Sequence, residues 1–227
     1  VHTHAQRGWV RTNVERDLTQ PGVDRTILLA MPLDHWSGAL NDECAKLLAE
    51  FPDKFCGFIG IHPPDVEESL RRIDTYCKKG FIGIKLMPTS GYYPDDEKHR
   101  KVFEEINARK LIVLQHCGWC SQGIKGKDMF QSTRFSEPYH VEPLARVFTD
   151  TDFILAHAGG LTYFPQASEL TRYHSNIYID TCPGQGTWTL RHGGHWLNHL
   201  NWKNVLFGTD MIWGSDSQAR SAKSYAE

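Results

Sequence analysis

Short apolar runs alternate with amphipathic segments along the whole chain. The apolar runs lack the polar alternation of a half-exposed sheet, which is typical of strands buried on both faces. We expect strands over residues 2–4, 26–31, 55–61, 81–87, 111–116, 153–157, 176–180 and 205–210. Apolar residues recur at helical spacing between them, which predicts helices over 40–51, 66–77, 97–110, 141–148, 165–173 and 188–200.

This regular alternation predicts a single parallel sheet. Eight strands within 227 residues fit one closed (β/α)8 TIM barrel, and we treat residues 1–227 as a single domain. An open doubly wound sheet is the alternative, weakened because no glycine-rich nucleotide-binding pattern follows any strand. The segment after residue 216 is short and polar, so we expect a shortened C-terminal end of the barrel.

Composition limits the classes of partner. The net charge of −2 provides no electrostatic basis for binding nucleic acid or an anionic membrane. No apolar run is long enough to span a membrane, and no signal peptide is visible. Six scattered cysteines indicate reduced thiols and a cytoplasmic location. The expected partner is a small-molecule substrate, and a homodimer is left open.

Histidine or aspartate ends four of the expected strands. His2 and His4 lie on one side of the first strand because side chains alternate along a strand. His116, His157 and Asp210 end three later strands. Because the C-terminal ends of barrel strands converge at one mouth, we expect all five side chains to face one cavity suited to a divalent metal ion. Alone, the His2–His4 pair is more typical of a tag remnant or an exposed strand end than of a metal site.

Motifs along almost the whole chain resemble the amidohydrolase superfamily, specifically its amidohydrolase 2 branch of metal-dependent barrel hydrolases. In chain order they are His2-Thr-His4, Gly22-Val-Asp-Arg-Thr, Phe51-Pro-Asp-Lys-Phe-Cys-Gly-Phe, Gly83-Ile-Lys-Leu, His116-Cys-Gly, Leu155-Ala-His157-Ala-Gly-Gly and Phe207-Gly-Thr-Asp210. Each motif is short, but their order and spacing together are specific. Family members usually continue past the eighth strand into a helical tail with an Asn-Ala-x-Arg-Leu motif, which does not occur before Glu227.

The resemblance implies one divalent ion, zinc or manganese. Its implied ligands are His2, His4, His116 and Asp210. Asp210 would also exchange a proton with water activated by the ion, and His157 would contact that water or the substrate oxyanion. For His157 the alternative is an interior histidine whose hydrogen bonds are satisfied by the protein.

Lys85 has two interpretations. Related subgroups carboxylate a lysine at this strand end to bridge two metal ions, whereas in the one-metal branch the lysine pairs with a carboxylate or a substrate anion. A buried lysine without a partner would be costly. We expect one ion, or two if Lys85 is carboxylated.

Other residues are candidates for substrate contacts at the mouth. Arg7 and Trp9 follow the first strand and could hold a planar, anionic molecule. Trp119 lies in the aperiodic segment 118–137, which we interpret as a lid or specificity loop. Asp180-Thr-Cys182 ends the seventh strand and is either part of the site or a cap of the loop.

Cys117-Gly-Trp-Cys120 has the spacing of a redox pair. A redox cysteine usually opens a helix, which lowers the pKa of its thiol. Here the pair follows a strand-end histidine, and polar loop residues continue after it. We therefore interpret both cysteines as loop residues.

The expected function is hydrolysis of a C–O or C–N bond in a small, anionic molecule. The alternative is non-oxidative decarboxylation of an aromatic or unsaturated carboxylic acid, since the same branch contains such lyases and the motifs do not separate the two reactions. The short C-terminal section favours hydrolysis. An inactive barrel that only binds a ligand is disfavoured by the full set of candidate ligands at four strand ends.

Overall fold

Eight parallel strands form one sheet in chain order. The computed structural model describes residues 2–9, 12, 14–15, 24–34, 38–119, 132–182, 191–208 and 210. The strands are β1 His2–Thr3, β2 Thr26–Leu29, β3 Phe55–Gly60, β4 Gly83–Leu86, β5 Ile112–Gln115, β6 Phe153–Leu155, β7 Ile177–Asp180 and β8 Val205–Leu206. All eight predicted strands are confirmed. Each is one to four residues shorter than predicted, at its start, its end or both.

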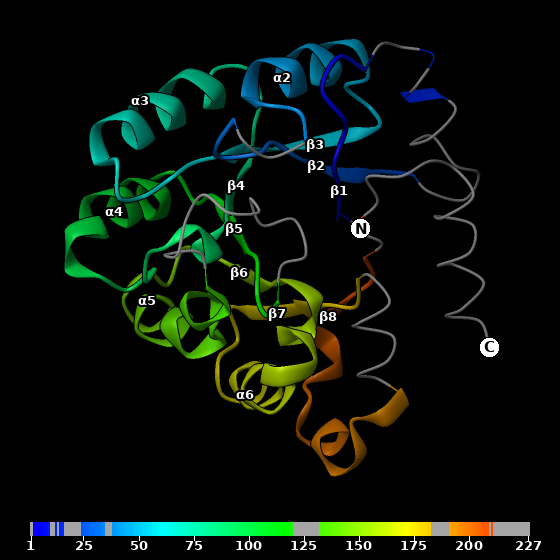
Figure 1. Ribbon diagram of the computed structural model, residues 1–227, viewed down its shortest axis with the longest axis vertical. Coiled ribbons are helices and arrows are strands. Elements are labelled where there is room, and N and C mark those ends of the chain that lie inside the picture. Colours follow the sequence, from blue (N-terminus) through cyan, green and yellow to red (C-terminus); the bar gives the residue numbers. More distant parts are fainter. Residues whose placement is uncertain are drawn as a thin grey trace.

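The sheet curls into the predicted TIM-barrel-like arrangement, with its strands at the centre of the molecule (Figure 1). Each strand pairs with the next in parallel, from β1 with β2 to β7 with β8. Beyond β8, the backbone N–H of Asp210 donates to the carbonyl of His2 at 3.0 Å. This hydrogen bond connects the end of the sheet to its beginning.

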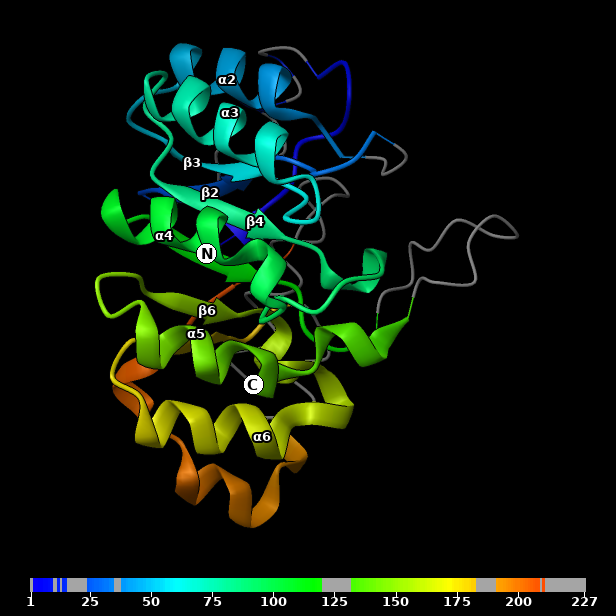
Figure 2. The same cartoon turned by 90° about the vertical axis from the view of Figure 1, so that its left-hand side faces the viewer.

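Helices cover the outside of the sheet (Figures 1 and 2). The α-helices are α2 Asn41–Glu50, α3 Val66–Cys77, α4 Arg100–Ala108, α5 Glu142–Val147 and α6 Gly160–Tyr173. Short 3-10 helices are η1 Pro88–Ser90, η2 Glu97–His99, η3 Thr133–Ser136, η4 Pro138–Val141, η5 Ala156–Gly159, η6 Gly194–His199 and η7 Trp202–Asn204. α3 has the predicted bounds; it buries Ile73 and Tyr76 and is capped by Asp65, whose side chain accepts from the Glu68 N–H at 3.2 Å.

Two predicted helices differ from the structure. α6 begins at Gly160 rather than at Pro165, because Gly159 (φ 80°) and Gly160 (φ 66°) turn the chain into the helix directly after β6. Proline favours the first turn of a helix, and this preference misled the prediction. Within the predicted helix over 188–200, residues 188–190 lie outside the described part of the chain, and Gly194–His199 forms a 3-10 helix.

A small apolar cluster is separate from the main hydrophobic core. It consists of Leu29, Phe58, Leu114, Ile154 and Ala156, on four different strands or their ends. Lys85 on β4 lies opposite Gly60 of β3 and Leu114 of β5. Because residues in register on parallel strands point to the same face, Lys85 shares the face of this cluster.

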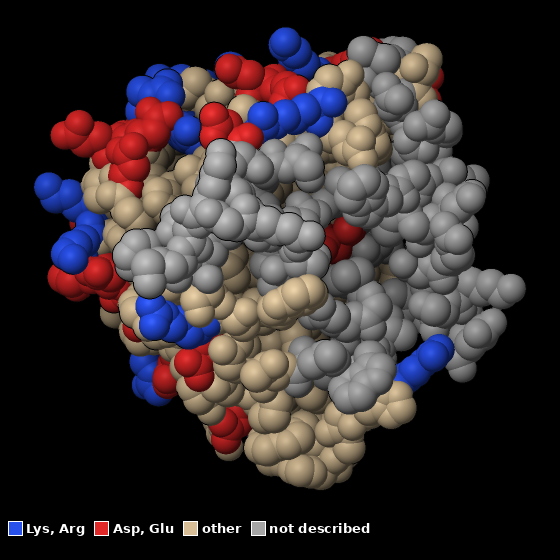
Figure 3. All heavy atoms as spheres, in the orientation of Figure 1, with Lys and Arg blue, Asp and Glu red and all other residues tan. Residues whose placement is uncertain are grey.

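Both signs of charge are interspersed over the outer helices. Figure 3 shows Lys and Arg next to Asp and Glu over α2, α3 and α4. Glu68 pairs with Arg71 at 2.6 Å and with Arg72 at 2.7 Å, and Lys78 pairs with Asp74 at 2.6 Å. Within the described ranges, no helix is both long and apolar enough to cross a membrane.

Candidate metal centre

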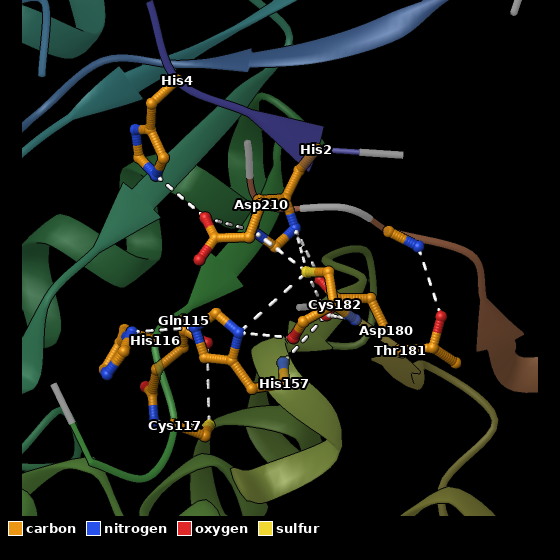
Figure 4. A network of polar contacts seen from close by, with 11 residues as sticks. His2, His4, Gln115, His116, Cys117, His157, Asp180, Thr181, Cys182 and Asp210 are labelled. Carbon is orange, nitrogen blue, oxygen red and sulfur yellow. Dashed lines mark hydrogen bonds and ion pairs between the residues drawn. The ribbon is translucent and has the colours of Figure 1, made fainter. Parts of the chain in front are cut away.

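The carboxylate of Asp210 lies between two imidazoles at the mouth of the barrel (Figure 4). Oδ1 of Asp210 is 3.2 Å from Nε2 of His2 and 3.5 Å from Nε2 of His4. Both histidines are buried, and the Asp210 side chain is 21% exposed. The structure thus brings together three of the four ligands implied by the resemblance.

A second pair of imidazoles lies next to the first. Nε2 of His157 is 3.0 Å from Nδ1 of His116, and the His157 and His2 ring centroids are 5.9 Å apart. Burial is the main cause that lowers the pKa of His116 and His157 below 6.5, so both rings are neutral at pH 7.

Hydrogen bonding assigns the tautomers of these two rings. Nδ1 of His157 lies 2.6 Å from the carbonyl oxygen of Cys182, which only accepts, so this nitrogen must carry the proton. The unprotonated Nε2 of His157 then accepts from Nδ1 of His116. Consequently Nε2 of His116 has a free lone pair, and this buried atom has no hydrogen-bond partner among the described residues.

The donor set fits a divalent transition metal ion. Three imidazoles with one carboxylate suit zinc and are compatible with manganese. The unsatisfied Nε2 of His116 is costly unless an ion, water or substrate atom meets it. Burial also lowers the pKa of His4 to about 3, which keeps this ring in the neutral form that metal binding requires.

His2 is positioned between two carboxylates. Its Nδ1 lies 2.7 Å from Oδ2 of Asp180, while its Nε2 faces Asp210. Burial alone lowers the pKa of His2, but Asp180 and then Asp210 outweigh burial and raise it to about 9. In the same way, His2 and the other imidazoles outweigh burial at both carboxyls and hold their pKa values below the usual range. The metal-free site thus holds an imidazolium whose Nε2 proton a metal ion would replace.

Asp180 and Cys182, left ambiguous by the sequence, contact the centre of the site. Sγ of Cys182 is 3.3 Å from both ring nitrogens of His2 and 2.9 Å from Oδ1 of Asp180. Ligand-type atoms of His2, Asp180 and Cys182 lie within 4.8 Å of one another, so they form a second candidate metal group. Burial raises the pKa of the Cys182 thiol, which disfavours a thiolate ligand.

Three residues of the site have a left-handed backbone conformation. The φ angles are 64° at His157, 51° at Ala158 and 49° at Asp210. A non-glycine residue pays about 1–3 kcal/mol for such a conformation, which persists where neighbouring contacts maintain it. The N–H of His157 donates to Oδ1 of Asp180 at 2.8 Å, and the N–H of Asp210 donates to His2.

Lys85 is fully buried inside the barrel, with 1% of its surface exposed. The pKa values of His4 and His116 are lowered mainly by the burial of these rings, and the positive charge of Lys85 lowers them further. Lys85 is therefore close enough to act electrostatically on the site. The structure leaves both predicted roles of Lys85 open.

The remaining candidates make other contacts. Arg7 is exposed and donates to the backbone carbonyls of Gly38 and Asp34. Trp9 is half-buried and packs against the main hydrophobic core, and Trp119 is 62% exposed. Most of the predicted loop over 118–137 lies outside the described residues. Substrate contacts by these three residues stay predictions.

Cys117 is not placed as a redox thiol. It is fully buried, and burial raises its pKa to about 12, whereas a redox cysteine needs a lowered pKa. Cys120 lies outside the described residues.

A family model described as amidohydrolase matches residues 21–223. The chain belongs to the amidohydrolase 2 family. This membership confirms the resemblance seen in the sequence motifs. No curated protein matches this amidohydrolase 2 member by sequence.

Solved structures share its fold at low sequence identity. A TIM-barrel protein from Bordetella bronchiseptica has a TM-score of 0.65 and 15% identity, covering 89% of this chain and 71% of that one. A dihydroxybenzoic acid decarboxylase from a Polaromonas species, with manganese and 2-nitroresorcinol bound, has a TM-score of 0.62 and 17% identity, covering 100% and 88%. The 5-carboxyvanillate decarboxylase of Novosphingobium aromaticivorans, with manganese and 4-hydroxy-3-methoxy-5-nitrobenzoic acid, has a TM-score of 0.62 and 19% identity, covering 94% and 76%. These similarities establish the fold.

Proposed function

We propose that this protein is a metal-dependent, non-oxidative decarboxylase of a small aromatic carboxylic acid. The observation that carries the metal dependence is the convergence of His2 and His4 on Asp210, beside the unsatisfied Nε2 of His116. Decarboxylation is favoured because two structures of similar fold are decarboxylases with manganese and aromatic ligands. This reverses the preference for hydrolysis that we drew from the sequence.

The ion would be held by His2, His4, His116 and Asp210. When bound, it would supply positive charge that neutralises the oxygen atoms of an acidic aromatic substrate. Lys85 would add a second, fixed positive charge on the inner face of the barrel. A substrate with a carboxylate next to a hydroxyl group matches this arrangement of charge.

Decarboxylation replaces the carboxyl group on the ring carbon with a proton, so the site must hold a proton that it can deliver. Nδ1 of His157 is committed to the Cys182 carbonyl at 2.6 Å. Its Nε2 accepts from Nδ1 of His116 at 3.0 Å, so it is the ring nitrogen that would take up a proton and then pass it to the ring carbon. The left-handed turn at His157 fixes where this atom lies. The carboxyl of Asp210, with its lowered pKa, stays ionised and would serve as a ligand.

The test combines metal analysis with a substrate panel. Protein loaded with manganese or zinc should contain about one ion per chain and release carbon dioxide from hydroxybenzoates. Metal-dependent hydrolysis of lactones or amides, with no release of carbon dioxide, would overturn the proposal in favour of hydrolysis. Two ions per chain, with extra mass on Lys85, would indicate the bridged two-metal form.

His157 is tested separately. His157→Asn should retain the ion but lose about 10²–10⁴-fold in turnover, the range expected for removal of a general acid or base. The control is Asp150→Asn, whose parent side chain is 58% exposed and 3.8 Å from Lys110. Loss of metal in parallel with activity would instead mean that His157 acts through His116.

A further inference from the structure

Asp180, the last residue of β7, connects the two halves of the site (Figure 4). Its carboxylate is 3% exposed. Oδ2 lies 2.7 Å from Nδ1 of His2, and Oδ1 accepts the backbone N–H of His157 at 2.8 Å. The Cys182 thiol donates to the same Oδ1 at 2.9 Å. An ionised carboxylate can only accept, so the His157 N–H and the Cys182 thiol donate to Oδ1. Nδ1 of His2 forms an ion pair with Oδ2 and must carry a proton, because its lone pair would repel the carboxylate.

The first contact determines which nitrogen of His2 is available to a metal ion. With Nδ1 protonated toward Asp180, a neutral His2 ring has its lone pair on Nε2. This Nε2 lies 3.2 Å from Oδ1 of Asp210, the same oxygen that lies 3.5 Å from Nε2 of His4. A protonated Nε2 could not bind the ion.

The second contact maintains the backbone at His157. Its φ of 64° is unfavourable for a side chain of this size, and the hydrogen bond to Asp180 helps to offset that cost. The ring is fixed from the other side, because Nδ1 of His157 donates to the carbonyl of Cys182, two residues beyond Asp180. The end of β7 therefore sets both the backbone and the ring of His157, which in turn contacts His116.

We propose that Asp180 is a positioning residue that fixes the tautomer of His2 and the turn at His157. It does so without binding the ion. The consequence for metal affinity rests on the proposed function, but the ion pair with His2 and the hydrogen bond from His157 exist without a metal. Carboxylates that orient a ligand histidine in this way typically contribute about 10- to 100-fold to metal affinity.

Asp180→Asn separates the two contacts. The amide oxygen of asparagine can still accept the His157 N–H, whereas its NH2 group would face Nδ1 of His2. Two donors cannot pair, so His2 must protonate Nε2 instead. We expect manganese affinity to fall about 10- to 100-fold while exchange protection of the His157 amide is retained. Asp180→Ala should reduce both the manganese affinity and the exchange protection of the His157 amide. The control Asp150→Asn should change neither quantity.

A measurement on the metal-free protein keeps this inference distinct from the proposed function. The Nδ1 proton of His2, bonded to a carboxylate, should give a far-downfield proton NMR signal that disappears in Asp180→Asn. If the parent protein binds no divalent ion, the proposed function fails, yet loss of this signal still supports the role of Asp180. An unchanged signal, or metal affinity equal to that of the parent protein, in a folded Asp180→Asn variant would overturn the inference.

Discussion

The pH dependence of stability in the metal-free protein tests the electrostatic arrangement of the site. Burial lowers the pKa values of His4, His116 and His157, so the unfolded chain binds more protons than the folded one below their ordinary value of 6.5. Stability must therefore rise with pH up to about 6.5. The pKa of His2 is raised, so its stabilising contribution is fully present below 6.5 and is lost as the pH rises through about 9. We predict a stability maximum near pH 6.5.

The size of the decrease in the free energy of unfolding above pH 6.5 follows from the raised pKa of His2. A pKa raised from 6.5 to about 9 corresponds to about 3 kcal/mol, at about 1.4 kcal/mol per tenfold change in proton affinity. This is a large part of the roughly 5–15 kcal/mol by which domains are stable. Asp180 and Asp210 do not affect stability between pH 5.5 and 9. Their pKa values are lowered, so the stabilisation they contribute is lost only at acid pH, below the ordinary pKa of an aspartate.

The assay is urea unfolding of chelator-treated protein between pH 5.5 and 9, with and without manganese. A bound ion replaces the Nε2 proton of His2, so added manganese should abolish the decrease above pH 6.5. His2→Gln should abolish the decrease between pH 6.5 and about 8 even without metal; nearer pH 9 the buried thiols of Cys44, Cys117 and Cys182, whose pKa values are raised, add a decrease of their own. An unfolding free energy that stays flat from pH 6.5 to 9 in the chelated parent protein would refute a charged His2 between the two carboxylates.

Two substitutions extend these tests to a ligand and to the scaffold. Asp210→Ala should sharply reduce metal content measured by atomic absorption, and full occupancy in that variant would contradict its role as a ligand. Gly60→Ala should lower the free energy of unfolding by about 1–3 kcal/mol or more, because a Cβ there would lie 2.5 Å from the backbone carbonyl of Met31, which cannot move as a side chain can. A melting temperature unchanged by Gly60→Ala would contradict this packing argument.

The strands after β1 could be predicted because each is a short apolar run that ends in a turn or polar residue, whereas β1 was expected from the His2-Thr-His4 pattern. The same runs identified the mouth, since parallel strands bring His2, His116, His157 and Asp210 to one end. The predicted start of α6 at Pro165 was wrong. Proline is favoured in the first turn of a helix, but Gly159 and Gly160 already turn the chain, so the helix begins five residues earlier, at Gly160.

Asp180 shows where prediction from sequence stops. An aspartate at a strand end is as typical of a loop cap as of a functional group, so its residue type did not decide its role. What decides it is the barrel's register, which places its two oxygens against a side chain on β1 and a backbone N–H after β6. Such contacts join residues 23 or more positions apart and leave no local pattern.

The site also lies where the barrel closes. His2 begins β1, Asp210 follows β8, and they are joined by a backbone hydrogen bond of 3.0 Å and a side-chain contact of 3.2 Å. An ion held by both residues would add a third link between the first and last strands. Its binding free energy would then contribute to closure of the sheet as well as to catalysis. This coupling would explain why the polar network is buried: the residues proposed to bind the ion are also those that hold the ends of the barrel together.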